Sequence, residues 1–188
     1  SLPASLTKVG FTRIEEIDEE GKEHQYNAVR LLFEQQETKL SCNSLQEIEI
    51  AEGNPLYQAR NGMVYSKDGK NLIFVPRGVT AVEVPDGTET IDPYAFFICF
   101  KLEKVDLPSS LKTVGYNAFH YCEALTDMTL PEGLEYIDNS AFFGVESWNY
   151  GAIPQSVKYI GPYAFYECAA ESIIVPENIT EIYEQTFA

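Results

Sequence analysis

The sequence Ala-Phe-His-Tyr-Cys at residues 118–122 sets an imidazole, His120, two positions before a thiol, Cys122. A cysteine nucleophile and a histidine general base are the two groups from which cysteine-dependent hydrolases build their active sites. Such a site also needs a group that orients the imidazole, and nothing in the sequence pairs His120 with an orienting carboxylate. Whether this pair is reactive or structural therefore has to be inferred from the surrounding sequence.

Metal sites and nucleotide-binding loops are not indicated by the remaining motifs. The two histidines, His24 and His120, belong to separate segments, and no Cys-x-x-Cys or His-x-x-x-His spacing occurs, so we expect no zinc site. An acidic run could gather calcium but lacks the alternating Asp/Asn ladder of a dedicated loop, and we interpret it as a solvated hairpin tip; it comprises Glu15, Glu16, Asp18, Glu19, Glu20 and Glu23. No Walker glycine pattern and no Gly-x-Ser-x-Gly is present. The sequence therefore predicts no catalytic residue, no metal site and no cofactor.

Composition and charge exclude further classes of function. Among 188 residues, 29 are acidic and 13 are basic, which gives a formal net charge of −16. This charge repels phosphate backbones and anionic lipid headgroups, so we expect neither a nucleic-acid partner nor membrane insertion. The longest apolar runs, such as residues 72–75, are far shorter than a bilayer span, and residues 1–10 do not have the pattern of a signal peptide.

An internal repeat organises most of the chain. Four segments align without gaps at a spacing of 23 residues, which is the separation of Phe119 from Phe96. They are AVEVPDGTETIDPYAFFICFKLE (81–103), KVDLPSSLKTVGYNAFHYCEALT (104–126), DMTLPEGLEYIDNSAFFGVESWN (127–149) and YGAIPQSVKYIGPYAFYECAAES (150–172). The sequence IIVPENITEIYEQTFA begins a fifth copy. Repeats of this length predict stacked structural units.

Each repeat predicts two short strands. Val105 and Leu107 alternate with polar residues, which places both side chains on one face of a strand that Pro108 ends. Leu111 and Val114 predict a second extended piece, after which Gly115 is expected to bend the chain toward Ala-Phe. One such coil cannot bury its apolar side alone, so we predict a solenoid with a continuous core.

The repeat columns also answer the question about His120 and Cys122. Cys122 shares its column with Cys99, Val145 and Cys168, and valine at one position can only pack, so this column is predicted to be core. His120 occupies a column of aromatic residues, and Trp148 replaces the core leucines 102 and 125. We therefore interpret the pair as a buried thiol beside a partly exposed imidazole, and Trp148 as a core side chain. Parallel side chains lack the approach that a disulfide needs, so we expect all four cysteines to be free.

The repeat resembles a known family. The signature L-x-x-[IV]-x-[IL]-P-x-x-[LV]-x-x-[IV]-G-x-x-A-F-x-x-C, matched over roughly residues 72–188, is similar to that of the BspA-like leucine-rich repeat family of bacterial surface proteins. The sequence NPLYQARNGMVYSKDGKNLIFVP (54–76) also resembles an elaborated repeat of this family. There, the turn Lys67-Asp68-Gly69-Lys70 predicts a hairpin between residues 63–66 and 72–75. The resemblance implies an exported or surface-attached protein that contacts proteins of a host or a neighbouring cell.

The N-terminal third is predicted to be an interrupted rung of the same domain. SLPASLTKVG matches DLPSSLKTVG and CNSLQEIEI matches CEALTDMTL, with an insertion at residues 11–41 between them. Within it, IEEIDEEGKEH predicts two arms around a Glu20-Gly21 turn, and YNAVRLLF suits a strand. A helix remains the alternative for this part, with an apolar face of Val29, Leu32, Phe33 and Leu40. We thus predict a single solenoid domain over residues 1–188, with a hairpin-bearing repeat at 51–78 and regular repeats at 79–188, the last incomplete.

The outward-facing columns are the remaining candidates for function. One column alternates in charge through Glu89, Lys112, Glu135 and Lys158, which predicts cross-strand ion pairs that set the register of the rungs. The adjoining column reads Thr90, Thr113, Tyr136, Tyr159 and Glu181, so two tyrosines on successive rungs form an exposed aromatic step, with Tyr150 elsewhere on the coils. Solenoids use such extended faces with amphipathic rings to bind ligands.

The sequence thus predicts a mainly β, right-handed leucine-rich-repeat solenoid with hairpin insertions. We expect a non-catalytic binding or adhesion module at the cell surface that contacts protein or glycan ligands, with Tyr136, Tyr159 and Tyr150 as candidate ligand-binding residues. Two alternatives remain, namely a structural spacer in a larger surface protein and a hydrolase that acts on surface glycans through paired carboxylates. Because the chain begins and stops within a rung, we also expect more chain to flank it.

Overall fold

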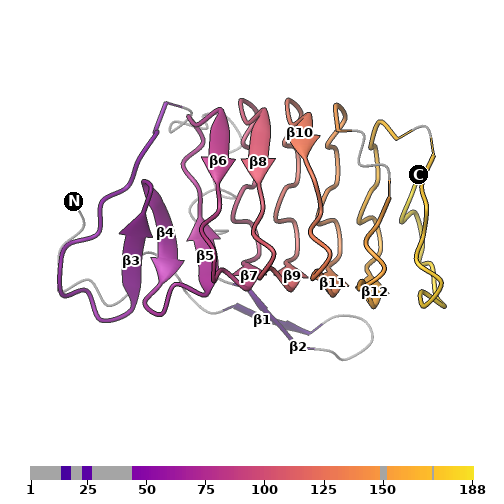
Figure 1. Ribbon diagram of the computed structural model, residues 1–188, viewed down its shortest axis with the longest axis horizontal. Coiled ribbons are helices and arrows are strands. Elements are labelled where there is room, and N and C mark those ends of the chain that lie inside the picture. The colour runs from indigo at the N-terminus through magenta and orange to yellow at the C-terminus, as the bar shows by residue number, and fades with distance from the viewer. Residues whose placement is uncertain (1–13, 18–22, 27–43, 149–151, 171) are drawn as a thin grey trace.

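The protein folds into a row of stacked coils (Figure 1). The computed structural model describes residues 14–17, 23–26, 44–148, 152–170 and 172–188. The repeats at 81–103, 104–126 and 127–149 each contribute two short strands, and the repeat at 150–172 contributes one strand among the described residues. The first strands are β6 (Ala81–Glu83), β8 (Lys104–Asp106) and β10 (Asp127–Met128), and the second strands are β7 (Thr90–Ile91), β9 (Thr113–Val114), β11 (Tyr136–Ile137) and β12 (Tyr159–Ile160). No helix occurs among these residues, which confirms the mainly β solenoid.

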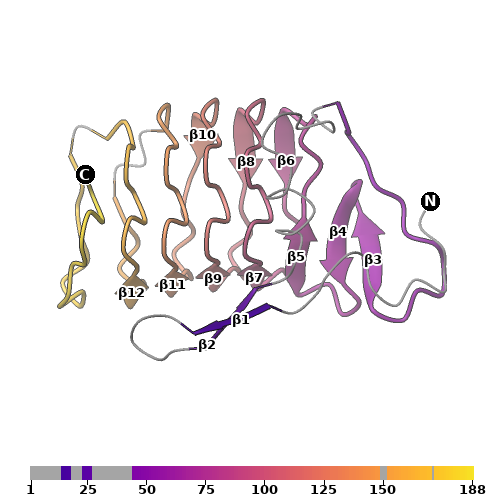
Figure 2. The ribbon, with the colours of Figure 1, turned by 180° about the vertical axis from the view of Figure 1, so that it is seen from behind.

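The strands of successive repeats pair in parallel and form two separate sheets. The first strands make a three-stranded sheet in the order β10-β8-β6, and the second strands belong to a seven-stranded sheet in the order β12-β11-β9-β7-β5-β4-β3. Figures 1 and 2 show these sheets at opposite ends of each coil. The register joins equivalent residues, because Ile137 pairs with both Val114 and Ile160. The spacing of 23 residues seen in the sequence is therefore one turn of the solenoid.

Antiparallel hairpins precede the regular repeats. β4 (Met63–Ser66) pairs with β5 (Asn71–Phe74) across the predicted turn, in which Gly69 has a φ of 76°. A further strand, β3 (Tyr57–Arg60), pairs with β4 and was not expected from the sequence. In the N-terminal segment, β1 (Ile14–Ile17) and β2 (Glu23–Tyr26) pair antiparallel, as two arms around a turn should. Residues 27–43, including most of YNAVRLLF, lie outside the described residues, so the division of the chain into parts stays a prediction.

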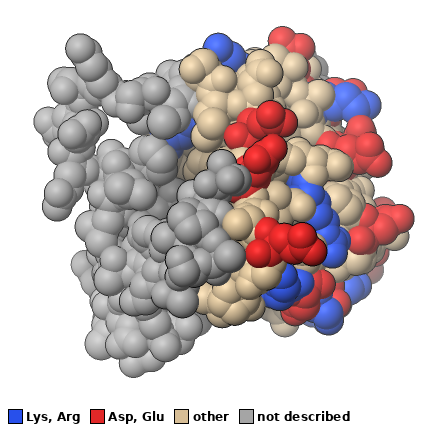
Figure 3. All heavy atoms as spheres, turned by 90° about the vertical axis from the view of Figure 1, so that its left-hand side faces the viewer, with Lys and Arg blue, Asp and Glu red and all other residues tan. Residues whose placement is uncertain are grey.

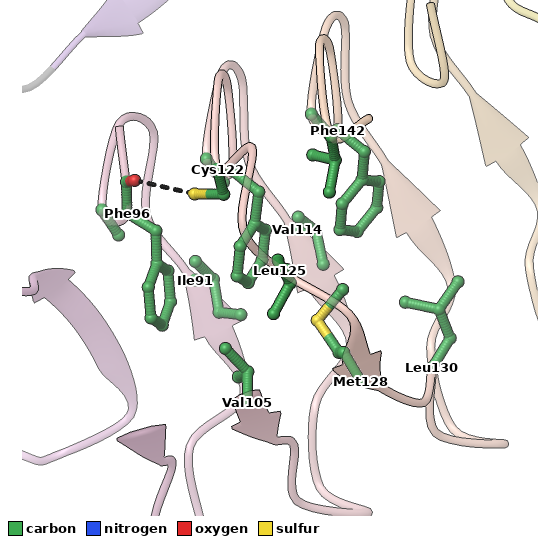
Figure 4. Packing of buried hydrophobic residues seen from close by; sticks show 14 of the residues in the cluster. Ile91, Phe96, Val105, Val114, Cys122, Leu125, Met128, Leu130 and Phe142 are labelled. Atoms are coloured by element: carbon green, nitrogen blue, oxygen red, sulfur yellow. Dashed lines mark hydrogen bonds between the residues drawn. The ribbon is translucent and has the colours of Figure 1, made fainter. Parts of the chain in front are cut away.

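Columns of identical side chains build the core. The phenylalanine column is fully buried at Phe96, Phe119 and Phe142, and its rings stack with centroid distances of 4.4 and 5.2 Å. The stack continues through Phe165 to the half-buried Phe187, at 5.3 and 5.7 Å. Figure 4 shows the rings of Phe96 and Phe142 together with residues of the aliphatic columns, among them Ile91, Val114 and Leu125. Each rung therefore covers its neighbour, as a solenoid requires.

The turn around Ala-Phe uses a backbone conformation that the sequence did not signal. In each repeat, two residues around the alanine of Ala-Phe have a positive φ. The residues directly before the alanine are Tyr94, Asn117, Ser140 and Tyr163. The residues three positions after the alanine are Ile98, Tyr121, Gly144 and Glu167. This region is unfavourable for bulky and β-branched residues such as Ile98. The strain is offset by hydrogen bonds between rungs, because the N–H of Ile98 donates to the carbonyl of His120 at 2.8 Å and the N–H of Tyr121 donates to that of Phe143 at 2.8 Å.

Gly115, at the predicted bend, is not among the residues with a positive φ. Its backbone passes so close to the preceding rung that a Cβ would lie 2.8 Å from Pro93 N and 2.9 Å from the carbonyl oxygen of Ile91. Gly161 is placed alike, with a Cβ 2.4 Å from Asn139 Oδ1. Glycine stands at these two positions because the backbone meets the preceding rung there with no room for a side chain.

Candidate ligand-binding surface

The His120 and Cys122 pair is structural. Cys122 is fully buried and its thiol donates to the carbonyl oxygen of Phe96 at 3.1 Å, as Figure 4 shows. The His120 ring stacks on Phe143, with centroids 4.6 Å apart and planes 15° apart, and meets Tyr121 edge-on at 4.5 Å. Burial lowers the pKa of His120 to about 4 and raises the pKa of Cys122 well above its usual value. Near neutral pH both groups are uncharged, so neither a thiolate nor an imidazolium forms here.

The predicted core roles of the thiols and the indole are confirmed where the structure describes them. Cys99, Cys122 and Cys168 are free, and burial raises the pKa of Cys99 and of Cys168 to about 12. Cys42 lies outside the described residues. Trp148 is 1% exposed, its Nε1 donates to the carbonyl oxygen of Met128 at 2.8 Å, and its ring lies 5.0 Å from that of Phe142.

The described residues contain no group of three histidine, cysteine, aspartate or glutamate side chains that could hold a metal ion. The acidic run at 15–23 is not included in this finding, because its side chains lie outside the described ones.

The tyrosine step lies on the outer side of the seven-stranded sheet. Tyr136 of β11 pairs with Thr113 of β9 and with Tyr159 of β12, so the three side chains stand on successive rungs. Successive residues of a strand face opposite sides, and accordingly Ile137 and Ile160 are buried while Tyr136 is 46% exposed. Strand geometry thus brings the two predicted tyrosines together. Tyr150, the third predicted residue, lies outside the described residues.

A shallow hollow opens beside the step. It has a volume of about 290 Å³ and is lined by Thr113, Tyr136, Asp138 and Tyr159. The Tyr159 hydroxyl donates to Asn139 Oδ1 at 3.3 Å, which ties this ring to the preceding rung. We call the five residues Thr113, Tyr136, Asp138, Asn139 and Tyr159 the tyrosine face.

One aromatic neighbour of this face was missed at the sequence level. The Tyr183 ring lies 5.8 Å from that of Tyr159, and its hydroxyl donates to Glu181 Oε2 at 2.8 Å. The last repeat is one residue shorter than the others, which shows in the spacing between Pro154 and Pro176. The column that places Glu181 after Tyr159 already includes this deletion, and the same spacing places Tyr183 opposite Gly161, where a ring extends the aromatic surface.

The alternating charges beside the tyrosine face form ion pairs. The Glu135 carboxylate contacts Lys158 Nζ on one side and lies 3.8 Å from Lys112 Nζ on the other. The hydrogen bond from Lys158 holds the pKa of Glu135 below its usual range. Glu89 pairs instead with Lys70, at 2.8 Å, from the hairpin turn. These exposed pairs contribute little to stability. The carboxylates of Glu135 and Asp138 together balance the ammonium groups of Lys112 and Lys158 next to the hollow.

The repeats match a known protein family. The family described as BspA type leucine rich repeat region matches residues 69–188 in six copies. The chain belongs to this BspA-type leucine-rich repeat family. No curated protein matches the chain.

Solved structures agree with the BspA-type assignment. The pneumococcal vaccine antigen PcpA is 27% identical, with a TM-score of 0.67, over 71% of this chain and 34% of the PcpA chain. A leucine-rich repeat protein from Bacteroides capillosus is 24% identical, with a TM-score of 0.55, over 62% of this chain and 96% of its own. The second likeness shows the fold alone. This BspA-type chain thus spans about a third of the length of PcpA.

Proposed function

We propose that this chain is a non-catalytic binding module of an exported or cell-surface bacterial protein, and that it contacts a protein or glycan ligand through the tyrosine face. The observation that carries the proposal is the pair of tyrosines in strand register, Tyr136 and Tyr159, with a hollow of about 290 Å³ beside them. Tyrosine is enriched at binding surfaces because it buries a large ring and keeps a polar tip at little entropic cost.

The position on a solenoid supports this role. The strands of the seven-stranded sheet hold the two rings on adjacent rungs over a core that is fully buried at Ile137 and nearly so at Ile160. A binding group on such rigid elements loses little freedom when a ligand arrives. The ring of Tyr159 is additionally held between Asn139 and Tyr183.

The chemistry of the hollow favours binding over hydrolysis. Glycoside hydrolases need two carboxyl groups about 5 to 10 Å apart across the scissile bond. Asp138 is the one carboxylate among the four residues that line the hollow. A binding role therefore accounts for the lining residues better than the hydrolase alternative does.

Family membership and the likeness to PcpA, which is described as a vaccine antigen, support a location at the cell surface. Within the part of the chain that the structure describes, no helix is both long enough and apolar enough to cross a membrane.

The test is a protein and glycan array probed with the chain, followed by affinity measurements on a double variant, Tyr136→Ser with Tyr159→Ser. We expect the double variant to bind the array ligand more weakly by at least about 1 kcal/mol, with an unchanged melting transition. The matched control, Tyr136→Phe with Tyr159→Phe, keeps both rings and should retain most of the affinity. Unchanged affinity in the serine variant would contradict the proposed site and move it to the insertion at 11–41. A chain without any ligand would fit the spacer alternative.

A further inference from the structure

The tyrosine face differs from the other aromatic columns in having an uncovered ring. Along the core, each phenylalanine stacks on the next, and outside it His120 stacks on Phe143 and Phe143 on Tyr166 at 4.8 Å. Tyr136 makes no such ring contact within the described residues, and its hydroxyl makes no hydrogen bond there. Its ring therefore offers both an apolar face and a polar tip to a ligand.

We propose that the ligand of the tyrosine face is a neutral, extended glycan that runs along the row of rungs, with successive sugar units against Tyr136 and Tyr159. This inference rests on the proposed binding function and specifies its ligand. Paired strands of a sheet lie about 4.8 Å apart, and this spacing is comparable with the advance of one pyranose unit along an extended β-linked chain. Because Tyr136 and Tyr159 are direct register partners, they supply platforms at that interval.

The polar lining suits the two kinds of surface on a sugar. The C–H face of a pyranose is apolar and slightly positive, which matches the negative face of an aromatic ring. The hydroxyls around its edge need hydrogen-bond partners once they leave water. Thr113 supplies a hydroxyl that both donates and accepts, and the Asp138 carboxylate, which accepts from Asn139 N at 2.7 Å, has lone pairs left for further hydroxyls.

The dimensions of the hollow favour a glycan over a folded protein. A stable protein interface covers about 800 Å² on each partner and is anchored by apolar side chains in its centre. The hollow extends over three rungs only, and none of its four lining residues is aliphatic. Its volume of about 290 Å³ lies at the small end of the range for sites that hold small molecules.

The electrostatics favour an uncharged glycan. Glu135 is paired with Lys112 and Lys158, and the carboxylates of Glu135 and Asp138 together balance the two ammonium groups, so no net positive charge is left to attract an anionic sugar. Asp138 places a negative charge in the hollow itself, and the whole chain carries −16. At the end of the molecule where β3 lies, Figure 3 shows acidic and basic side chains side by side among the described residues. Glycans with carboxylate or sulfate groups would be repelled at this site.

The experiment measures binding by ligand-observed NMR with cellopentaose, chitopentaose and β-1,4-mannopentaose as neutral extended probes. Maltopentaose serves as the curved chain and a hyaluronan oligosaccharide as the anionic chain. We expect at least one neutral extended probe to bind more tightly than both of these, with a Kd that stays constant between about 0.05 and 0.5 M salt because no ion pair forms. Tyr136→Ser should raise the Kd at least about fivefold, which corresponds to about 1 kcal/mol, and Tyr136→Phe by less than about twofold. The melting transition of each variant checks that it folds.

The outcomes separate this inference from the proposed function. If the array yields a protein ligand whose binding is lost in the Tyr136→Ser and Tyr159→Ser double variant, while none of the neutral probes binds, the glycan inference is wrong and the binding function stands. Preferential binding of the hyaluronan oligosaccharide, or binding that weakens steeply with salt, would also overturn the inference. Binding of a neutral probe that Tyr136→Ser leaves intact would place the glycan site elsewhere and contradict both proposals.

Discussion

Replacing Phe119 with alanine tests whether stacking between rungs holds the solenoid together. Phe119 is fully buried, and its ring is stacked on both sides, against Phe96 at 4.4 Å and Phe142 at 5.2 Å. Substitution of a core phenylalanine by alanine costs about 3 to 5 kcal/mol, and each aromatic pair accounts for about 0.5 to 1.5 kcal/mol beyond its buried area. Because two ring pairs are lost, we expect Phe119→Ala to lower the free energy of unfolding by an amount near the upper end of this range.

A matched variant at the end of the same column separates stacking from simple loss of volume. Phe187 is half-buried and stacks on one ring, Phe165, at 5.7 Å. Phe187→Ala removes the same atoms, but it should cost only about 1 to 2 kcal/mol because less area and one ring pair are lost.

Urea unfolding followed by the fluorescence of Trp148 measures both variants. This residue is the sole tryptophan of the chain and packs on Phe142, one rung from the substituted ring. Phe119→Leu keeps most of the volume but loses both ring pairs, so it should cost about 1 to 3 kcal/mol, less than Phe119→Ala. A loss below about 2 kcal/mol for Phe119→Ala, or equal losses for the two alanine variants, would refute the reasoning that stacked rings couple the rungs.

Two further predictions follow from burial. Because the pKa of His120 is about 4 in the folded chain and about 6.5 in the unfolded one, its contribution to stability is present above pH 6.5 and is lost as the pH falls through 4. His120→Phe matches Phe97 and Phe143 of the same column and removes this titration. Between pH 7 and 4 the variant should therefore lose less of its free energy of unfolding than the parent, by roughly 1 to 2 kcal/mol after screening by solvent. Identical pH profiles of the two proteins would show that the imidazole ionises freely. The second prediction is that all four cysteines remain thiols, so titration with a thiol reagent under denaturing, non-reducing conditions should count four. The three described thiols should react slowly at pH 8 in the folded protein, because burial raises their pKa values; a count of two or fewer would contradict the core assignment of the cysteine column.

Most of the solenoid was predictable because every rung buries the same apolar positions against its neighbours. A valine in the column of Cys122 indicated a core position for the thiol, and leucines in the column of Trp148 indicated one for the indole. Repetition also aligned Tyr136 with Tyr159, since equivalent residues of stacked coils must be neighbours. The columns of equivalent residues thus predicted which side chains are neighbours in space.

Other features were not predictable because they depend on contacts that vary between rungs. The positive φ of Ile98 has no signal in the sequence, since a β-branched residue is disfavoured there and only the hydrogen bond to His120 of the next rung offsets the strain. Lys70 takes Glu89 as its partner because the hairpin turn brings it there, which the column alone did not show. The hollow beside Tyr136 likewise depends on how side chains lean after the backbone is fixed.

Two outer columns alternate from one rung to the next, so their pattern repeats every two rungs. Glu89, Lys112, Glu135 and Lys158 alternate in charge, and in a neighbouring column Asp92, Gly115, Asp138 and Gly161 alternate between a carboxylate and a site with no room for one. Removing repeat 104–126 would bring Glu89 beside Glu135 and Asp92 beside Asp138, whereas removing two adjacent repeats would keep the alternation in both columns. Such an array can grow or shrink by duplication and deletion of repeats. The alternation of charges is kept only when an even number of repeats is gained or lost. A length change by an odd number of rungs would leave a seam of like charges across the face that carries the tyrosines.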